Sequence, residues 1–212
     1  MATYDKGILG SVSGTVGTVI GSSWRSIYLL KSRPGKRKGL PTLNQLMQQA
    51  KFLLISKFLF SLSGLIKESF SLDRKSLTGN NQALSYNLTN AVTGDYPGYE
   101  IDYSKVRISE GVLTNADGPA AVSTEAGKIK FTWSSMAGVG SAKATDTAVL
   151  VLYCPDKKIG VFSKTDKEHA EETASITINS FSGKKVHTWL TFIAEDGKTY
   201  ANSEYAGEVT VL

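Results

Sequence analysis

The residues that most often carry catalytic or metal chemistry are scarce in this sequence of 212 residues. It holds one cysteine, Cys154, and two histidines, His169 and His187. A single cysteine excludes an internal disulfide framework and a cysteine-rich zinc site. An enzyme that uses carboxylates alone stays compatible with this composition, although no Ser/His/Asp or Cys/His arrangement is recognisable. We therefore expect a protein that is not an enzyme and that holds no metal and no cofactor.

Glycines near the N-terminus suggest a phosphate site at first sight. They recur every three or four residues, at Gly7, Gly10, Gly14, Gly17 and Gly21. A P-loop, however, ends in Gly-Lys-Ser/Thr, and here Gly21 is followed by Ser-Ser-Trp. A dinucleotide fingerprint needs a βαβ unit, which does not follow. Because glycine permits close backbone approach, the run predicts an arm used for packing or assembly.

Positive charge is concentrated just after these glycines. The aromatic residues Trp24 and Tyr28 precede the cluster, and rings beside cations suit stacking on single-stranded nucleic acid. The same cluster could instead contact an acidic neighbouring subunit or form a solvated loop. In this segment, the predicted partner-binding residues are Trp24, Arg25, Lys31, Arg33, Lys36, Arg37 and Lys38.

The charge of the whole chain is unevenly distributed. Residues 1–80 contain 12 Lys and Arg against 3 Asp and Glu, whereas residues 81–212 contain 12 against 16, which gives the net charge of +5. Such asymmetry predicts a basic partner-binding segment beside a neutral-to-acidic domain. The partner could be nucleic acid, an anionic surface or the acidic half of a neighbouring copy.

The start of the chain is predicted to form a glycine-rich extended arm or a hairpin, over residues 1–41. Residues 15–20 alternate loosely as in a strand, Gly21-Ser-Ser reads as a turn, and residues 24–30 read as a second strand. The basic stretch that follows contains a proline and two glycines, so it is predicted to be an exposed loop.

A helix is predicted to begin immediately after the basic loop. Thr42, with Gln45 three residues later, forms a Thr-x-x-Gln capping box, and apolar residues follow at helical spacing. From Phe52 onward the helix is apolar on both faces, and such a helix must be covered by other protein. We therefore predict that Leu54 and Phe58 contact a partner. Shorter helices are expected at 62–70 and 80–92.

Beyond residue 95 the apolar pattern changes from helical spacing to alternation with period two. Seven short strands are expected, at 99–108, 128–134, 147–153, 159–163, 174–179, 186–194 and 208–212. Their number and spacing predict an antiparallel β-sandwich of the immunoglobulin or fibronectin type III kind. The expected fold class is α+β, with an arm at 1–41, a small helical segment at 42–95 and the sandwich at 96–212.

No targeting or membrane segment is recognisable. The N-terminus has no basic region followed by an apolar run, so no secretory signal is predicted. The most apolar stretch, at 52–66, contains Lys57 and is too short to span a bilayer. We expect no membrane span and a location in the cytoplasm, in a virion or in another particle.

Several segments together carry a resemblance to a known family. They lie at residues 14–25, 31–34, 41–45, 49–52, 83–87 and 99–105. Through this combination the chain resembles, nearly end to end, a family of uncharacterised proteins common in Bacteroidota, a domain of unknown function. The N-terminal part is also similar to the start of some phage- and prophage-associated proteins. The resemblance implies no activity and supplies no functional residues.

These observations together favour a structural role without catalysis. They are the absence of a catalytic constellation, the helix with two apolar faces and the opposite charge of the two halves. We expect a subunit of a larger particle, cellular or phage-derived, whose arm and helices form subunit contacts in a homo-oligomer. The alternative is a nucleic-acid-binding protein that uses the basic region 24–38. A sandwich module whose loops bind carbohydrate or protein is a third possibility.

Overall fold

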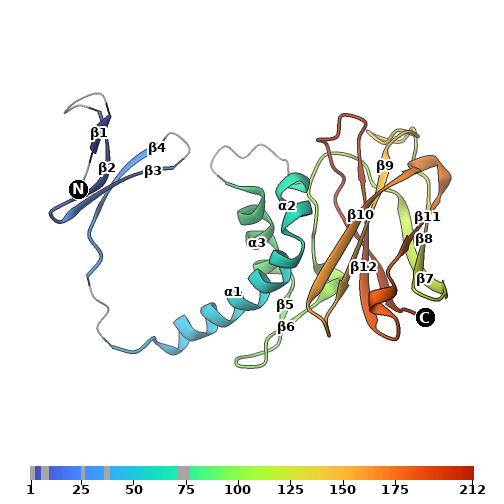
Figure 1. The fold of residues 1–212 in the computed structure, drawn as a ribbon, viewed down its shortest axis with the longest axis horizontal. Helices are drawn as coiled ribbons and strands as arrows, with labels where there is room; N and C mark the ends of the chain where they lie inside the picture. The colour runs from blue at the N-terminus through green and yellow to red at the C-terminus, as the bar shows by residue number, and fades with distance from the viewer. Residues whose placement is uncertain (1–2, 6–9, 25–26, 36–38, 71–76) are drawn as a thin grey trace. The chain divides into compact units, whose positions relative to one another are not determined.

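The computed structural model of the protein describes residues 3–5, 10–24, 27–35, 39–70 and 77–212. Contacts between residues divide the chain into two compact units, Met1–Thr42 and Leu43–Leu212 (Figure 1). The first unit is a small sheet, and the second contains three helices and a two-sheet sandwich.

The N-terminal unit is an antiparallel sheet with the strand order β1-β2-β3-β4. Its strands are β1 (Thr3–Asp5), β2 (Ser11–Val16), β3 (Val19–Trp24) and β4 (Ile27–Ser32). The structure therefore has four paired strands in place of the expected extended arm or single hairpin. Consecutive strands pair directly, so this unit is built from local contacts.

The turns of this sheet also differ from the expected ones. β2 and β3 are joined at Gly17, whose φ of 56° is a conformation that glycine adopts readily. The predicted turn at Gly21 is wrong, because Gly21 lies inside β3 opposite Gly14. A side chain at Gly21 would overlap the backbone of Val12. Glycine is needed here for close strand packing rather than for a turn.

In the second unit, seven strands form two antiparallel sheets that pack face to face. One sheet has the order β10-β9-β12-β13, with bounds Ile159–Glu168, Thr147–Cys154, Lys185–Ile193 and Glu204–Thr210. The other has the order β11-β8-β7, with bounds Thr173–Thr177, Lys128–Ser134 and Asp117–Glu125. This is an immunoglobulin- or fibronectin-III-like β-sandwich, as predicted.

Two parts of the second unit depart from the predicted strands. β7 runs through a Gly-Pro pair that predicts a turn, and its register shifts between Asp117 and Ala120 to accommodate that pair. The strand expected at 99–108 is present only as β6 (Glu100–Ile101), which pairs with β5 (Val92–Thr93). A 3-10 turn at Tyr103–Lys105 replaces the rest of that strand.

The first hydrophobic core lies between the two sheets. Phe131 and Trp133 of β8 project into it, and Leu150 and Leu152 of β9 project from the opposite sheet. Trp133 contacts Phe192 of β12 edge-on, with 5.5 Å between ring centroids. These side chains alternate with outward-facing ones along β8, as expected for a sheet with one buried face.

Three helices cover the outer face of the β10-β9-β12-β13 sheet and form a second core with it (Figure 1). They are α1 (Leu43–Ser61), α2 (Ser63–Ser69) and α3 (Gly79–Asn90). Because side chains alternate along a strand, β9 also directs Val149 and Val151 to the helices. Helices and sandwich therefore share one unit, and the domain boundary expected near residue 95 is not found there.

Candidate functional site

A groove with a volume of about 570 Å³ opens beside α1 in the second unit. Leu53, Leu54 and Lys57 line it from the helix. Glu100 lines it from the β5–β6 hairpin, and Lys158 from the turn between β9 and β10. Three segments that are far apart in the sequence therefore meet at this groove.

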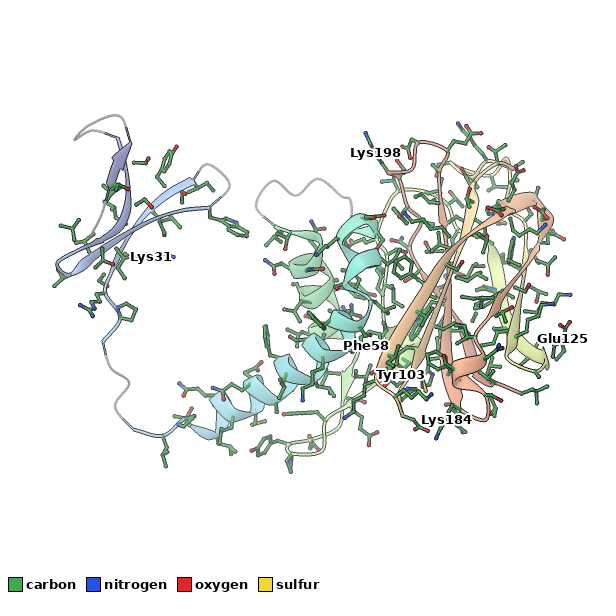
Figure 2. All side chains as sticks on the ribbon, viewed as in Figure 1. Lys31, Phe58, Tyr103, Glu125, Lys184 and Lys198 are labelled. Carbon is green, nitrogen blue, oxygen red and sulfur yellow. The ribbon has the colours of Figure 1, made fainter. Side chains whose placement is uncertain are left out.

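Aromatic rings form the floor of the groove. Phe58 contacts Tyr103 and Tyr153 edge-on, with 5.9 Å and 4.7 Å between ring centroids. Phe58 and Tyr103 lie where α1 meets the sheet (Figure 2). Burial, followed by the charges of Tyr153 and Tyr205, raises the pKa of Tyr103 to about 12. The Tyr103 phenol is therefore neutral at pH 7, and the floor offers an apolar contact surface rather than a base.

Charged side chains surround this apolar floor. They are Lys57 on α1, Lys158 in the β9–β10 turn and Glu100 on β6. Among the residues that the structure describes, none forms an ion pair with these three. Lys158 has a φ of 56°, a left-handed conformation that costs on the order of 1 kcal/mol or more for a residue with a Cβ. Unpaired charges at the rim of an apolar floor suit an amphipathic partner.

Only one face of α1 is covered within its own unit. Ile55 and Phe58 are buried in the second core, whereas Leu43, Leu53 and Phe60 are 61%, 54% and 79% exposed. Phe58, which was predicted to contact a partner, is instead a core residue, because the sheet and Tyr103 enclose its ring. The uncovered face is an apolar surface of the kind that marks an interaction site.

The N-terminal sheet exposes apolar side chains on both faces. In the β3–β4 pair, Trp24 is opposite Ile27, and Tyr28 is opposite Ser23. Directly opposed residues share a face and neighbours alternate. One face therefore carries Ile20, Trp24, Ile27, Leu29 and Lys31, and the other carries Val19, Tyr28 and Leu30. Most of these apolar side chains are between 39% and 69% exposed, and Ile20 is half-buried.

Among the described residues, no strand pairs with the outer edge of β4, the last strand of this sheet. All six of its residues are exposed. One side of such a strand presents unpaired backbone N–H and C=O groups, which can pair with a strand of another chain. Natural edge strands are often protected by charges or prolines, but residues 27–30 of β4 carry neither.

The basic residues predicted to bind a partner are only partly placed by the structure. Lys31 and Arg33 are exposed at the end of β4, where the Arg33 backbone N–H donates to the Thr18 carbonyl over 2.7 Å. Trp24 shares a face with Lys31, but Tyr28 lies on the opposite face, so the two rings do not form one stacking surface. Arg25, Lys36, Arg37 and Lys38 lie outside the described residues.

A polar cluster surrounds His169, and no sequence motif predicts it. His169 lies in a segment of the sequence that is rich in charged residues, yet it is fully buried. Its Nδ1 lies 2.9 Å from the Ser135 Oγ, and burial lowers its pKa more than nearby Asp146 raises it. Because Ser135 and His169 lie 34 residues apart, no local motif could have revealed the contact.

The cluster resembles a serine-histidine-aspartate relay only in composition. The Asp146 carboxylate accepts from the backbone N–H of Lys143 over 2.6 Å. Within the described residues, Asp146 Oδ1 and His169 Nε2 have no hydrogen-bond partner, so the carboxylate does not orient the imidazole. The contacts instead fasten the loop after β8 to the segment that contains His169.

No group of three or more His, Cys, Asp or Glu side chains that could hold a metal ion occurs among the described residues. In the same part of the chain, no single helix is long and apolar enough to cross a membrane. Taken together, α1 and α2 meet the criteria of length and composition, but they are bent by 90° at their junction.

A comparison with protein families identifies the chain. A family model described as a family of unknown function, DUF6266, matches residues 11–207. The chain belongs to the DUF6266 family. The resemblance to an uncharacterised family is thus confirmed at this level. Among curated proteins, none matches the DUF6266 chain.

Two solved structures resemble parts of this DUF6266 chain. The FN1–FN3 domains of chicken CNTN1 are 8% identical with a TM-score of 0.37, over 48% of this chain and 35% of that one. The fn3 domain of the human collagen alpha-1(XX) chain is 12% identical with a TM-score of 0.36, over 49% of this chain and 90% of that one. The sandwich assignment rests on the strand order of the DUF6266 chain itself.

Proposed function

We propose that the chain is a non-enzymatic structural protein, a subunit that assembles into a larger particle through its N-terminal sheet and helix α1. The observation that carries this proposal is the N-terminal sheet, which exposes apolar side chains on both faces and ends in the open edge of β4. A small sheet that buries so little surface is marginally stable alone. Pairing with other copies would cover both its faces and its edge.

The charge distribution supports the same role but supplies little of the energy. The first 80 residues carry 12 basic and 3 acidic residues, and the remainder carries 12 and 16. Exposed ion pairs contribute only about 0.2–1 kcal/mol each, so apolar contacts of the sheet and α1 would dominate assembly. We place such a particle in the cytoplasm or in a virion, with a Bacteroidota bacterium or one of its phages as the source.

The test is the mass of the full chain in solution, measured by light scattering after size-exclusion chromatography. Wild type should form an oligomer, and Leu30→Lys should reduce its mass, because Leu30 is 69% exposed on β4 and a lysine at an edge strand opposes pairing. The matched control is Val122→Lys on β7, an edge strand of the sandwich, where the native residue is 48% exposed.

The control variant should keep the wild-type mass. A wild-type chain that is monomeric at every concentration would overturn the proposal, and so would equal effects of the two lysine substitutions.

A second candidate function is the binding of single-stranded nucleic acid by the region 24–38. It is favoured by Trp24, which is 50% exposed and shares a face with Lys31. Lys31→Gln with Arg33→Gln should then lower the slope of log affinity against log salt by about 0.7 per lost phosphate contact. Fluorescence anisotropy with labelled single-stranded DNA measures this slope. A wild-type chain that does not bind at low salt would reject this candidate.

A further inference from the structure

The uncovered face of α1 has the spacing of a coiled-coil seam. Its residues follow one another at alternating intervals of three and four, and we call this set the α1 seam: Leu43, Leu46, Ala50, Leu53, Lys57 and Phe60. These are the a and d positions of a heptad pattern, which align along one side of a helix. Ile55 and Leu59, on the other side, are 0% and 7% exposed. The helix therefore presents one apolar stripe to its own core and a second one outward.

The α1 seam and the groove form one continuous surface, because Ala50, Leu53 and Lys57 belong to both. A helix of 19 residues is about 28 Å long and 10 Å wide, which gives a footprint on the order of 300 Å². A stable interface buries about 800 Å² on each partner. The seam alone is too small, so a partner that binds here must also fill the groove.

Of the charged residues that line the groove, Lys57 belongs to α1, Glu100 to the β5–β6 hairpin and Lys158 to the β9–β10 turn. Helix α1 contains Lys51 and Lys57 and no acidic residue. The hairpin on the other side carries Asp95 and Glu100, neither of which forms an ion pair with a described residue. The Glu100 carboxylate in this lining suits the approach of a cationic apolar helix, and the chain itself supplies such a helix. The surface is therefore complementary to a second copy of itself.

We propose that the α1 seam and groove bind the same surface of a second copy, with the two α1 helices antiparallel about a two-fold axis near Ala50 and Leu53. This inference rests on the assembly function proposed above and names the partner of α1. A parallel pair would place Lys57 against Lys57 at a shared a position, where like charges repel. In the antiparallel pair, each Lys57 lies beside Leu46 of the second copy and extends its stem over apolar surface.

The first experiment measures the mass of the full chain with Leu30→Lys, in which pairing through β4 is blocked. This variant should be a dimer, and Leu53→Glu added to it should give a monomer, because the carboxylate would enter the centre of the seam. Leu53 is 54% exposed, so the substitution leaves the chain's own cores intact. The matched control is Val112→Glu, at a residue that is 70% exposed and outside the surface, and it should remain dimeric.

The second experiment determines whether the two α1 helices are parallel or antiparallel. It stays informative even if Leu53→Glu fails to fold. Chains with Leu46→Cys and with Lys57→Cys are mixed and oxidised; the native Cys154 is buried. An antiparallel pair predicts a disulfide between the two different variants. Self-linked Leu46→Cys and Lys57→Cys chains would indicate a parallel pair and overturn the proposed geometry.

The outcomes separate the two proposals. Assembly that responds to Leu30→Lys but not to Leu53→Glu, without cross-linking, overturns the α1 pairing and leaves the assembly function standing. A dimer that responds to Leu53→Glu but not to Leu30→Lys supports the α1 pairing and removes the role of the sheet. A monomer in which Leu53 instead mediates binding to vesicles of anionic lipid overturns the pairing as well.

Discussion

At the scale of single residues, the two histidines are held neutral by the fold. His169 is fully buried, and His187 stacks on Tyr103 with 3.9 Å between ring centroids. Burial lowers the pKa of both, and for His187 the nearby Glu208 offsets this only in part. The folded chain therefore binds fewer protons than the unfolded chain once the pH falls to the ordinary histidine pKa of 6.5.

Stability should consequently decrease on acidification. A lowered pKa in the folded state means that the contribution is fully present above about pH 6.5 and is lost as the pH falls below it toward the folded pKa. His169→Gln should weaken this dependence between about pH 7 and pH 5, as measured by urea unfolding at a series of pH values. Glu204, whose pKa is raised by burial, acts in the opposite direction and is unchanged in the variant.

His187→Gln serves as the companion variant. It should remove a separate part of the pH dependence of the free energy of unfolding. If the free energy of unfolding of His169→Gln has the same pH dependence as wild type, His169 is not the group that takes up the proton.

At the scale of elements, the local sequence pattern correctly predicted those strand and helix bounds that depend on neighbouring residues. β8 covers the predicted residues 128–134, and α1 begins directly after Thr42, the predicted cap. β7 was missed because its Gly-Pro pair is a turn signal that the sheet overrides with a shift in register. The N-terminal turn was misplaced because Gly21 permits close strand packing. The spacing of glycines in a sequence does not distinguish this role from a role in a turn.

The groove could not be predicted, because its residues come from α1, the β5–β6 hairpin and the β9–β10 turn. One signal for the helical layer was nevertheless present in the sequence. β9 is apolar at nearly every position rather than at every second one, which is typical of a strand that is covered on both faces.

The helical layer packs tightly against the sheet at Gly160 of β10. A Cβ there would lie 2.5 Å from Leu62 Cδ2 and 2.8 Å from Ser61 Oγ, at the junction of α1 and α2. Gly160→Val should therefore cost about 1–3 kcal/mol, the usual range for overpacking. The free energy of unfolding in urea measures this loss.

Gly64→Ala in α2 is the matched control for that substitution. A Cβ at Gly64 would lie 3.5 Å from the Phe162 ring, which is an ordinary contact. Replacing a helical glycine by alanine under these conditions should stabilise the chain by about 0.5–1 kcal/mol. If both variants lost the same stability, tight packing at Gly160 would not be the cause.

At the scale of the whole molecule, the two units differ in how they are held together. Both hydrophobic cores consist of residues from the second unit, and among the described residues none from Met1–Thr42 contributes to them. The second unit therefore has what it needs to fold alone, whereas the first exposes the side chains that would have to form its core.

Removal of residues 1–42 should leave a folded chain with the same main melting temperature, followed by near-ultraviolet circular dichroism. The truncated chain should also lose every association that depends on β4 and retain pairing through α1. A truncated chain that has no cooperative transition would show that the N-terminal unit stabilises the second one.

The position of α1 early in the sequence has a consequence during synthesis. α1 ends at Ser61, but β12, which supplies Trp189 to the core around Phe58, ends at Ile193. At about 5–20 residues per second, a ribosome needs roughly 7–26 s to cover that interval. During this time the core-facing stripe of α1 lacks its sheet, so the nascent chain is most prone to aggregate before β12 emerges. Chaperones that act on nascent chains would therefore have α1 among their substrates.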